Sequence, residues 1–330
     1  HDALFTGRLL MQSYLAPSWL KGGGHVETIF PKFISAPALA FRRELLPDST
    51  GQAQVAYDFV DTPQEDTPLV VLFHGLEGNS NSHYAQALMA HVKQKQWLGV
   101  VVHYRGCGGV VNLSDKAYHS GDSLECAWVL KTLANRHPKR ARFAMGVSLG
   151  GNVLAKYLGE SREAALLDAA AVVSAPLDLV SASTALEHGL SRTLYAPYFL
   201  RTLLPKVKQE QALKPLPELD WQKLFASRSL KDFDDYYTAP VHGFANAHDY
   251  YQRSSAKPLL KHIARPTLII NAQNDPFMPA KALPTAADVS RHVRLYQPRH
   301  GGHVGFVSGR FPGHLNWLPQ TVLTFFSEQT

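Results

Sequence analysis

The chain has 330 residues, of which 45% are hydrophobic and 18% charged, a composition that supports a packed globular core and excludes a disordered chain. The formal net charge is +6, which raises the question of nucleic acid or an anionic membrane as a partner. Because the basic residues are scattered and are not interleaved with aromatic residues, we expect no nucleic-acid binding and at most a weak peripheral contact with a membrane.

The cysteines, the histidines and the length of the apolar runs further limit the cellular compartment and the kind of site that we expect. Cys107 and Cys126 are the only cysteines; they form no disulfide framework and fit a reducing compartment, so we expect a cytoplasmic protein. None of the 16 histidines lies in an H-E-x-x-H or Cys/His frame, so we expect no metal and no other cofactor. The longest apolar runs are too short to span a bilayer, and the opening residues carry no signal-peptide pattern.

Short apolar runs alternate with helix-like segments through much of the chain. Two strand-like runs joined by a turn-rich link come first, at 39–45 and 54–60. Later runs are continuously apolar, as buried parallel strands are, and amphipathic segments separate them. This alternation predicts an α/β fold, a mostly parallel sheet with helices on both faces. In chain order the later strand-like runs are "LVVLFHG", "LGVVVHYRG", "RFAMGVS", "LDAAAVVSAP", "RPTLIINAQND" and "VRLYQP".

Residues 177–263 interrupt this alternation. The segment has no strong strand pattern, is aromatic and helix-compatible, and is broken by prolines. A helix-rich stretch between two strands of one sheet predicts a helical cap inserted into a single domain, over the active site. The core is then 39–176 and 264–330, and residues 1–38 form an N-terminal extension that wraps it. A plain surface extension of the core is the alternative for the inserted segment.

The pentapeptide "GVSLG" stands where a strand is expected to turn into a helix. A tight turn of this kind leaves little room for side chains two positions before and after its centre, and Gly146 and Gly150 supply that room. Ser148 is then presented above the sheet beside a helix N-terminus, whose free N–H groups suit a developing oxyanion. The alternative is an ordinary helix start with Ser148 as its cap.

A serine nucleophile needs a base to take its proton, and the base needs an orienting acid. In α/β hydrolases the acid and then the histidine follow the serine along the chain. Asp275 follows the apolar run "TLII" directly before Pro276, and His303 follows the last strand-like run in a glycine-rich loop. We therefore predict Ser148, Asp275 and His303 as a catalytic triad. His300 is the competing base, but two glycines before His303 free the loop to bring that ring toward the serine.

An oxyanion in this position needs two N–H donors. We expect one from Leu149, directly after the nucleophile. The other is expected from "HGLEGN" at 74–79, a loop that follows an earlier strand. The Gly75–Leu76 peptide bends the chain there, so the N–H of Leu76 is the predicted second donor. His74 is expected to support this loop through hydrogen bonds.

Two other residues could take part in such chemistry. Asp178 follows the strand after the nucleophile, which is an alternative position for the acid in this architecture. Cys107 lies in "RGCGG" and could be a nucleophile, but no paired base is evident. A packed thiol is the preferred interpretation of Cys107.

With these residues in place, the chain resembles the YheT-like branch of the α/β-hydrolase superfamily, which is related to eukaryotic lipid-acting hydrolases. The resemblance covers most of the chain, and motifs such as "YHSG" and "RGCGG" are not general hydrolase patterns. It implies a carboxylic-ester hydrolase that uses Ser148, Asp275 and His303. The matching stretches are "PSWLKGGGHVETIFPKF", "HGLEGNSNSHY", "HYRGCGGVVN", "YHSGDSLE", "GVSLGGNVLAKYLGE", "NDPFMP" and "HGGHVGF".

Three positions depart from the family pattern. Asn274 stands before Asp275 where the family often has two adjacent acids, and this favours Asp275 as the acid. Glu125 ends "SGDSLE" where aspartate is expected, a change expected to be structural. Ser308 stands five residues after His303, where an acyltransferase signature has aspartate. Transfer to an acceptor other than water is therefore less expected.

Taken together, the sequence predicts a serine carboxylesterase that acts on short- to medium-chain or lipid-like esters. A thioesterase, phospholipase or acyltransferase with the same triad is the alternative within the fold, because fold and triad do not choose among these bonds. A non-catalytic protein that binds a small molecule under the cap is the alternative from another class. The sequence assigns no oligomeric state.

Overall fold

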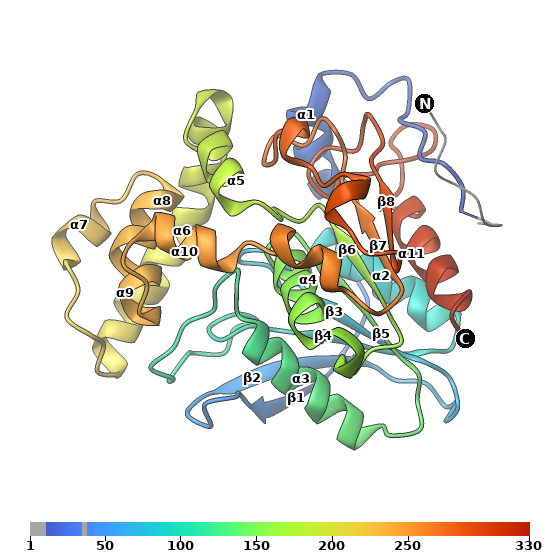
Figure 1. Cartoon of the computed structure of the whole chain (residues 1–330), viewed down its shortest axis with the longest axis horizontal. Coiled ribbons are helices and arrows are strands. Elements are labelled where there is room, and N and C mark those ends of the chain that lie inside the picture. Colours follow the sequence, from blue (N-terminus) through green and yellow to red (C-terminus); the bar gives the residue numbers. More distant parts are fainter. Residues whose placement is uncertain (1–10, 35–37) are drawn as a thin grey trace.

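One eight-stranded sheet organises the computed structural model, which describes residues 11–34 and 38–330 (Figure 1). Its strands are β1 (Arg42–Pro47), β2 (Gln54–Val60), β3 (Leu69–Phe73), β4 (Leu98–Val102), β5 (Arg142–Val147), β6 (Ala169–Val173), β7 (Thr267–Ile270) and β8 (Val293–Tyr296). The order across the sheet is β1-β2-β4-β3-β5-β6-β7-β8. β2 is antiparallel to both β1 and β4, and the other neighbours are parallel. The predicted mostly parallel sheet is thus confirmed.

Helices cover both faces of this sheet. They are α2 (His83–Gln94), α3 (Ser123–Arg136), α4 (Leu149–Ser161) and α11 (Trp317–Ser327). Side chains alternate along a strand, so Val71 of β3 packs in the apolar layer shared with α3 and α4, while Leu72 packs in the layer shared with α2 and α11. Both faces are therefore buried, which explains why the strands read as continuous apolar runs. Short 3-10 turns lie at η2 (Arg162–Ala164), η5 (Ala280–Ala282) and η6 (Ala286–Asp288).

Helix α11 was not foreseen from the sequence. Its segment contains Pro319 and several aromatic and β-branched residues, which lower the intrinsic preference for a helix. Burial decides the outcome, because Phe326 is completely buried and stacks on Phe143 of β5 with ring centroids 4.8 Å apart. Tertiary packing of an apolar face thus stabilises a helix that local propensity does not predict.

Between β6 and β7 the chain leaves the sheet and forms only helices. They are α5 (Leu179–Leu186), α6 (Gly189–Leu213), α7 (Trp221–Phe225), α8 (Leu230–Phe233), η3 (Asp234–Thr238), α9 (Ala239–His242), α10 (Ala247–Ser254) and η4 (Lys257–His262). The expected interruption by prolines is wrong for α6, which runs through Pro197 and Pro205. A proline removes one N–H donor from a helix, and the buried contacts of Leu200, Leu203 and Val207 in a small apolar cluster hold α6 together.

The first described residues, from residue 11 onward, lie against the C-terminal part of the chain. The Tyr14 hydroxyl donates to the carbonyl of Val307 at 2.9 Å, and the Trp317 indole donates to the carbonyl of Gln12 at 2.8 Å. Helix α1 (Gly23–Ile29) and η1 (Phe30–Phe33) follow. Of the predicted extension at 1–38, residues 1–10 and 35–37 lie outside the described residues. Across the described part of the chain, no helix is both long and apolar enough to cross a membrane.

Phe326→Ala is expected to lower the free energy of unfolding by about 3–5 kcal/mol, because it leaves a cavity between α11 and β5. Phe33→Ala is the control: the same change at a side chain that is 77% exposed should stay within about 0.5 kcal/mol of the parent. Urea unfolding followed by circular dichroism measures both. A loss below about 1 kcal/mol for Phe326→Ala would contradict the role given to α11.

Candidate active site

Ser148 occupies a sharp turn between β5 and α4. Its φ of 53° and ψ of −119° lie in a region that residues other than glycine rarely adopt. A Cβ at Gly146 would lie 2.5 Å from the carbonyl oxygen of Gly150, and a Cβ at Gly150 would lie 2.3 Å from the carbonyl oxygen of Phe73. The turn can close because glycine stands at both positions, and the serine hydroxyl is left facing the cavity described below.

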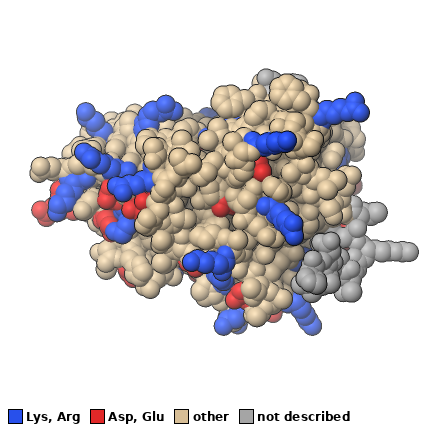
Figure 2. Space-filling model, turned by 90° about the horizontal axis from the view of Figure 1, so that it is seen from above, with Lys and Arg blue, Asp and Glu red and all other residues tan. Residues whose placement is uncertain are grey.

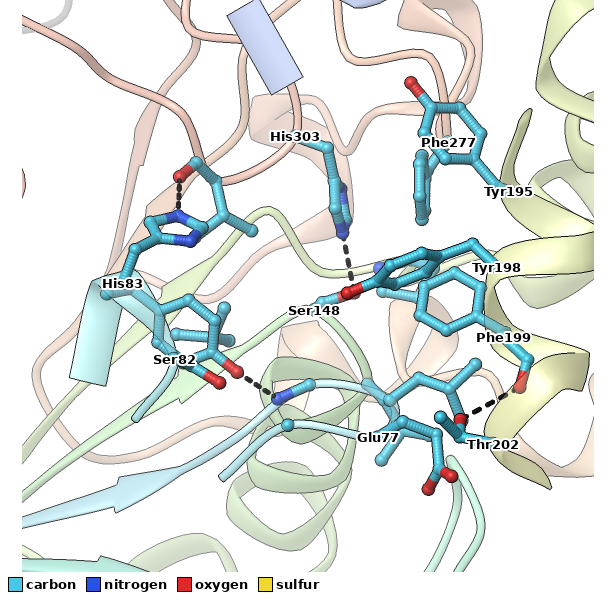
Figure 3. Close-up of a pocket in the computed structure, with 18 of the residues that line it drawn as sticks. Glu77, Ser82, His83, Ser148, Tyr195, Tyr198, Phe199, Thr202, Phe277 and His303 are labelled. Carbon is cyan, nitrogen blue, oxygen red and sulfur yellow. Dashed lines mark hydrogen bonds between the residues drawn. The ribbon is translucent and has the colours of Figure 1, made fainter. Parts of the chain in front are cut away.

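Three side chains from distant parts of the chain form a hydrogen-bonded row. His303 Nε2 lies 2.8 Å from Ser148 Oγ (Figure 3), and His303 Nδ1 lies 2.8 Å from Asp275 Oδ2. An ionised Asp275 can only accept, so it takes the Nδ1–H and leaves the Nε2 lone pair toward the serine hydroxyl. Ser148 then donates to His303, which is the arrangement that lets a histidine take up the hydroxyl proton.

The acid and the histidine come from the carboxyl ends of neighbouring strands. Asp275 follows β7 and His303 follows β8, so both reach the edge of the sheet at which Ser148 follows β5. Asp275 is buried and its Oδ1 accepts the N–H of Phe277 at 2.8 Å. The Phe277 ring lies parallel to the His303 ring, with centroids 3.9 Å apart and planes 9° apart. Phe277 therefore fixes both the carboxylate and the imidazole.

Helix α1 holds the loop that carries His303, a contact that the sequence does not indicate. The buried carboxylate of Glu27 accepts the N–H of Gly301 at 2.6 Å and the side-chain amide of Asn274 at 2.9 Å. The hydroxyl of Thr28 accepts the N–H of His303 at 2.9 Å. Glu27 thus ties together the loops that follow β7 and β8. The pattern "GGGHVETIF" was noted as a motif, but no spacing rule connects residues so far apart in the chain.

The other side of the same loop is held by the core. The N–H of Val304 donates to Ser174 Oγ at 3.0 Å, and His83 of α2 donates its Nε2–H to the Val304 carbonyl at 3.0 Å (Figure 3). Burial lowers the pKa of His83, so the ring stays neutral and keeps one nitrogen without a proton. Val304, the residue after His303, is therefore held by hydrogen bonds to both its N–H and its carbonyl group.

The structure places the competing candidates elsewhere. His300 is mostly exposed, and its Nδ1 lies 3.0 Å from Glu27 Oε1. Asp178 caps α5, where its carboxylate accepts both the N–H and the hydroxyl of Ser181 at 3.1 and 2.7 Å. Burial raises the pKa of the Cys107 thiol to about 12. A thiol with that pKa carries no thiolate near neutral pH, so it lacks the form that attacks.

Two backbone N–H groups lie beside Ser148. A Cβ on Gly75 would sit 3.2 Å from the Ser148 Cβ, so the loop 74–79 passes directly next to the serine. Within the described residues no acceptor is bonded to the N–H of Leu76. Leu149 is the first residue of α4, and its N–H has no partner inside the helix. Both residues line the same cavity as Ser148.

His74 connects this loop to the neighbouring strand. Its ring is fully buried, with Nδ1 2.7 Å from the carbonyl oxygen of Gly75 and Nε2 accepting the N–H of Tyr104 at 3.3 Å. Burial lowers the pKa of His74 to about 3. The neutral ring therefore donates from Nδ1 and accepts at Nε2, and both bonds need that single tautomer.

A second polar contact links the loop to the inserted helices. Glu77 has a positive φ of 56°, and its Oε2 accepts the hydroxyl of Tyr118 at 2.6 Å and the Lys206 ammonium at 2.8 Å. The Tyr118 oxygen in turn accepts the N–H of Glu77 at 3.0 Å. Lys206 belongs to α6, so a salt bridge joins the inserted segment to the residue after Leu76.

A cavity of about 1110 Å³ opens over the serine. Ser148 and His303 form part of its wall together with polar residues of the core, among them Glu77. In Figure 3 the aromatic rings of α6 and of the loop after β7 face the Ser148–His303 pair. These rings belong to Tyr198, Phe199 and Phe277, and Tyr195 packs on the Phe277 ring with centroids 4.5 Å apart. The wall is therefore apolar close to the serine hydroxyl.

Glu125 and Ser308, two of the residues that depart from the family pattern, are held by contacts with other parts of the chain. Glu125 Oε2 accepts from Arg105 at 2.6 Å, and Arg105 also pairs with Asp48 at 2.5 Å and Asp122 at 3.1 Å in a buried ion cluster. Ser308 pairs through its backbone with His314 in an isolated bridge. In the described ranges, no group of three His, Cys, Asp or Glu side chains is arranged to hold a metal ion.

The chain is similar to known proteins in both sequence and fold. A model of the α/β-hydrolase fold matches residues 68–309. The protein named "Putative esterase YheT" of Escherichia coli (strain K12) is 37% identical over 317 residues, covering 90% of this chain and 88% of that protein. Human "Phospholipase ABHD3" is 26% identical over 325 residues, covering 96% and 79%. A solved esterase of Pyrococcus furiosus superposes with a TM-score of 0.58 at 14% identity, covering 90% and 96%, a likeness of fold alone.

Glu27→Ala is expected to destabilise the protein by about 3 kcal/mol, because it leaves the buried donors of Gly301 and Asn274 without an acceptor. Glu27→Gln keeps one acceptor oxygen and should lose less. Hydrogen exchange of residues 300–305 should be faster in Glu27→Ala than in the parent. The control is Glu163→Ala at an exposed position; equal effects from both alanine variants would contradict the role assigned to Glu27.

Proposed function

The chain belongs to the α/β-hydrolase family, and we propose that it is a carboxylic ester hydrolase with Ser148 as nucleophile, His303 as base and Asp275 as orienting acid. The observation that carries the proposal is the pair of 2.8 Å hydrogen bonds from Ser148 to His303 and from His303 to Asp275. The Escherichia coli relative is named as an esterase, which favours the same class of reaction.

The proposed reaction has two halves that use the same residues. His303 Nε2 takes the hydroxyl proton as Ser148 Oγ attacks the ester carbonyl carbon, and the N–H groups of Leu76 and Leu149 donate to the resulting oxyanion. His303 then gives its proton to the leaving alkoxide, the carbon–oxygen bond breaks, and an acyl-enzyme remains. A water that loses a proton to His303 attacks this ester, and the acid leaves as Ser148 regains its proton.

The substrate class follows from the cavity wall. We infer an ester with an apolar acyl chain of short to medium length, or a lipid-like ester, because aromatic side chains of α6 lie next to Ser148. Residues 177–263 then act as a cap that shapes this pocket. A phospholipid is the second candidate substrate, favoured by the name of the human relative. A panel of esters, phospholipids, thioesters and acyl acceptors distinguishes these two candidates from a thioesterase or an acyltransferase. The cytoplasmic location expected from the cysteines stays a prediction.

Ser148→Ala is expected to lower ester turnover by at least about 10³-fold, since residual catalysis without the nucleophile is small. Intact-mass spectrometry after exposure to a fluorophosphonate should show one adduct on the parent and none on the variant. Ser183→Ala, at another serine of the cavity wall, should keep both the adduct and the turnover.

Full turnover in Ser148→Ala would disprove the proposed nucleophile. A folded parent that takes no adduct and hydrolyses no ester of the panel would also overturn the proposal, and it would favour the alternative of a small-molecule binding protein.

Lys206→Met is expected to lower kcat about tenfold while the KM for a small water-soluble ester stays near the parent value. The reason is that the buried Glu77 carboxylate loses its cationic partner and keeps the Tyr118 hydroxyl and a weaker contact of the Cys107 thiol at 3.8 Å. The loop then holds the N–H of Leu76 less firmly, and complete loss of one oxyanion donor costs about 10²-fold or more. Lys206→Arg should recover most of kcat, and Lys208→Met at an exposed neighbouring position is the control. A raised KM with unchanged kcat would contradict this positioning role.

A further inference from the structure

One side of α6, at the entrance of the cavity, carries a partly exposed apolar stripe. Leu190, Leu194 and Tyr198 follow one another at intervals of four residues, so they lie along one side of the helix. They are 63%, 41% and 44% exposed, whereas Tyr195 and Leu203 of the same helix are buried. Neighbouring exposed apolar side chains of this kind mark surfaces that bind a partner more often than plain solvent-facing surface does.

The stripe continues onto η1. Lys32 Nζ lies 3.9 Å from the centroid of the Tyr198 ring, and the ring of His25 stacks on Tyr195 with centroids 5.8 Å apart. Phe33, next to Lys32, is one of the most exposed apolar side chains of the described residues. We call the resulting surface the mouth face; its residues are Phe33, Lys32, Leu190, Leu194, Tyr198 and Arg201.

The mouth face borders the cavity over Ser148. Lys32, Tyr198 and Arg201 belong both to the mouth face and to the cavity wall. Figure 3 places Tyr198 on the α6 side of the pocket, directly across from the Ser148–His303 pair. A molecule held on the mouth face is therefore already at an entrance of the cavity.

The two charged side chains of the mouth face, Lys32 and Arg201, are both cationic. Between residues 17 and 33 and between residues 189 and 209 the only carboxylate is that of Glu27, and it is buried. Figure 2 views the molecule from above in the frame of Figure 1 and shows Lys and Arg spread over that face, with Asp and Glu gathered mainly at its left end. The cationic side chains of the two segments are Lys21, Lys32, Arg192, Arg201, Lys206 and Lys208.

We propose that the mouth face docks on the surface of an anionic lipid bilayer. Apolar side chains next to Lys32 and Arg201, which both lie against the Tyr198 ring, suit the boundary between headgroups and acyl chains, because the apolar groups leave water while the cations meet anionic headgroups. A second copy of this chain fits less well, since an isologous contact would bring the same cations together. Docking goes beyond ester hydrolysis; only the delivery of a lipid-like ester to Ser148 rests on the proposed function.

Co-sedimentation with vesicles tests the docking. The parent should bind vesicles of phosphatidylcholine with phosphatidylglycerol more tightly than vesicles of phosphatidylcholine alone, and added salt should weaken the binding. Leu190→Glu should reduce binding to the anionic vesicles about tenfold or more, because it replaces an inserted apolar group with an anion.

The matched control is Leu124→Glu. Leu190 is the second residue of α6 and Leu124 is the second residue of α3, so both changes add an acid in the first turn of a helix, where the helix dipole tolerates it. Leu124 is 80% exposed, and α3 lies at the lower edge of Figure 1, away from α1. Leu124→Glu should leave vesicle binding unchanged, and both variants should keep the parent turnover of a small water-soluble ester.

Three results would overturn the docking proposal. The first is that the parent does not sediment with anionic vesicles, and the second is that both leucine variants lose binding equally. The third is that the parent is a dimer in light scattering and Leu190→Glu dissociates it, which would assign the mouth face to a second copy. Vesicle binding without turnover of any ester would leave the docking proposal standing and contradict the proposed function.

Discussion

The close backbone approach around Ser148 is the constraint on which the rest of the site depends. The first turn of α4 rests against the end of β3, where a Cβ at Gly150 would lie 2.3 Å from the carbonyl oxygen of Phe73. The same approach brings Gly75 alongside the serine. Ser148, the N-terminus of α4 and the N–H of Leu76 are therefore brought together by one steric condition, the absence of side chains at the glycines of two neighbouring strand ends.

The histidine is positioned by the opposite means, through contacts collected from many parts of the chain. Thr28 and Glu27 hold the loop of His303 from the N-terminal side, while Ser174 and His83 hold it from the core. Each is a hydrogen bond to a backbone group of the loop, so the ring inherits its place from the main chain. The contact of Phe277 then fixes the ring plane.

Helix α6 joins two levels of the molecule. Its inner side sends Lys206 to Glu77, next to the loop beside Ser148. Another side of α6 carries the apolar stripe at the entrance of the cavity. A movement of α6 would therefore change both the surface at the entrance and the support of the N–H of Leu76. The helix tolerates two internal prolines because its buried side chains, and not a perfect ladder of hydrogen bonds, keep it in place.

The sequence by itself determined the order of strands and helices in the core and the chain positions of Ser148, Asp275 and His303, because apolar periodicity and a local turn are written in neighbouring residues. The sequence did not predict α11, because that helix depends on burial. It also did not predict that α1 holds the His303 loop, because Glu27 and Gly301 stand 274 residues apart. The sequence favoured His303 over His300, and only the tertiary structure brings the His303 ring within 2.8 Å of the serine hydroxyl. His300 and His303 share one loop, and the fold brings a buried carboxylate to His300, which leaves His303 to the pair formed by Ser148 and Asp275.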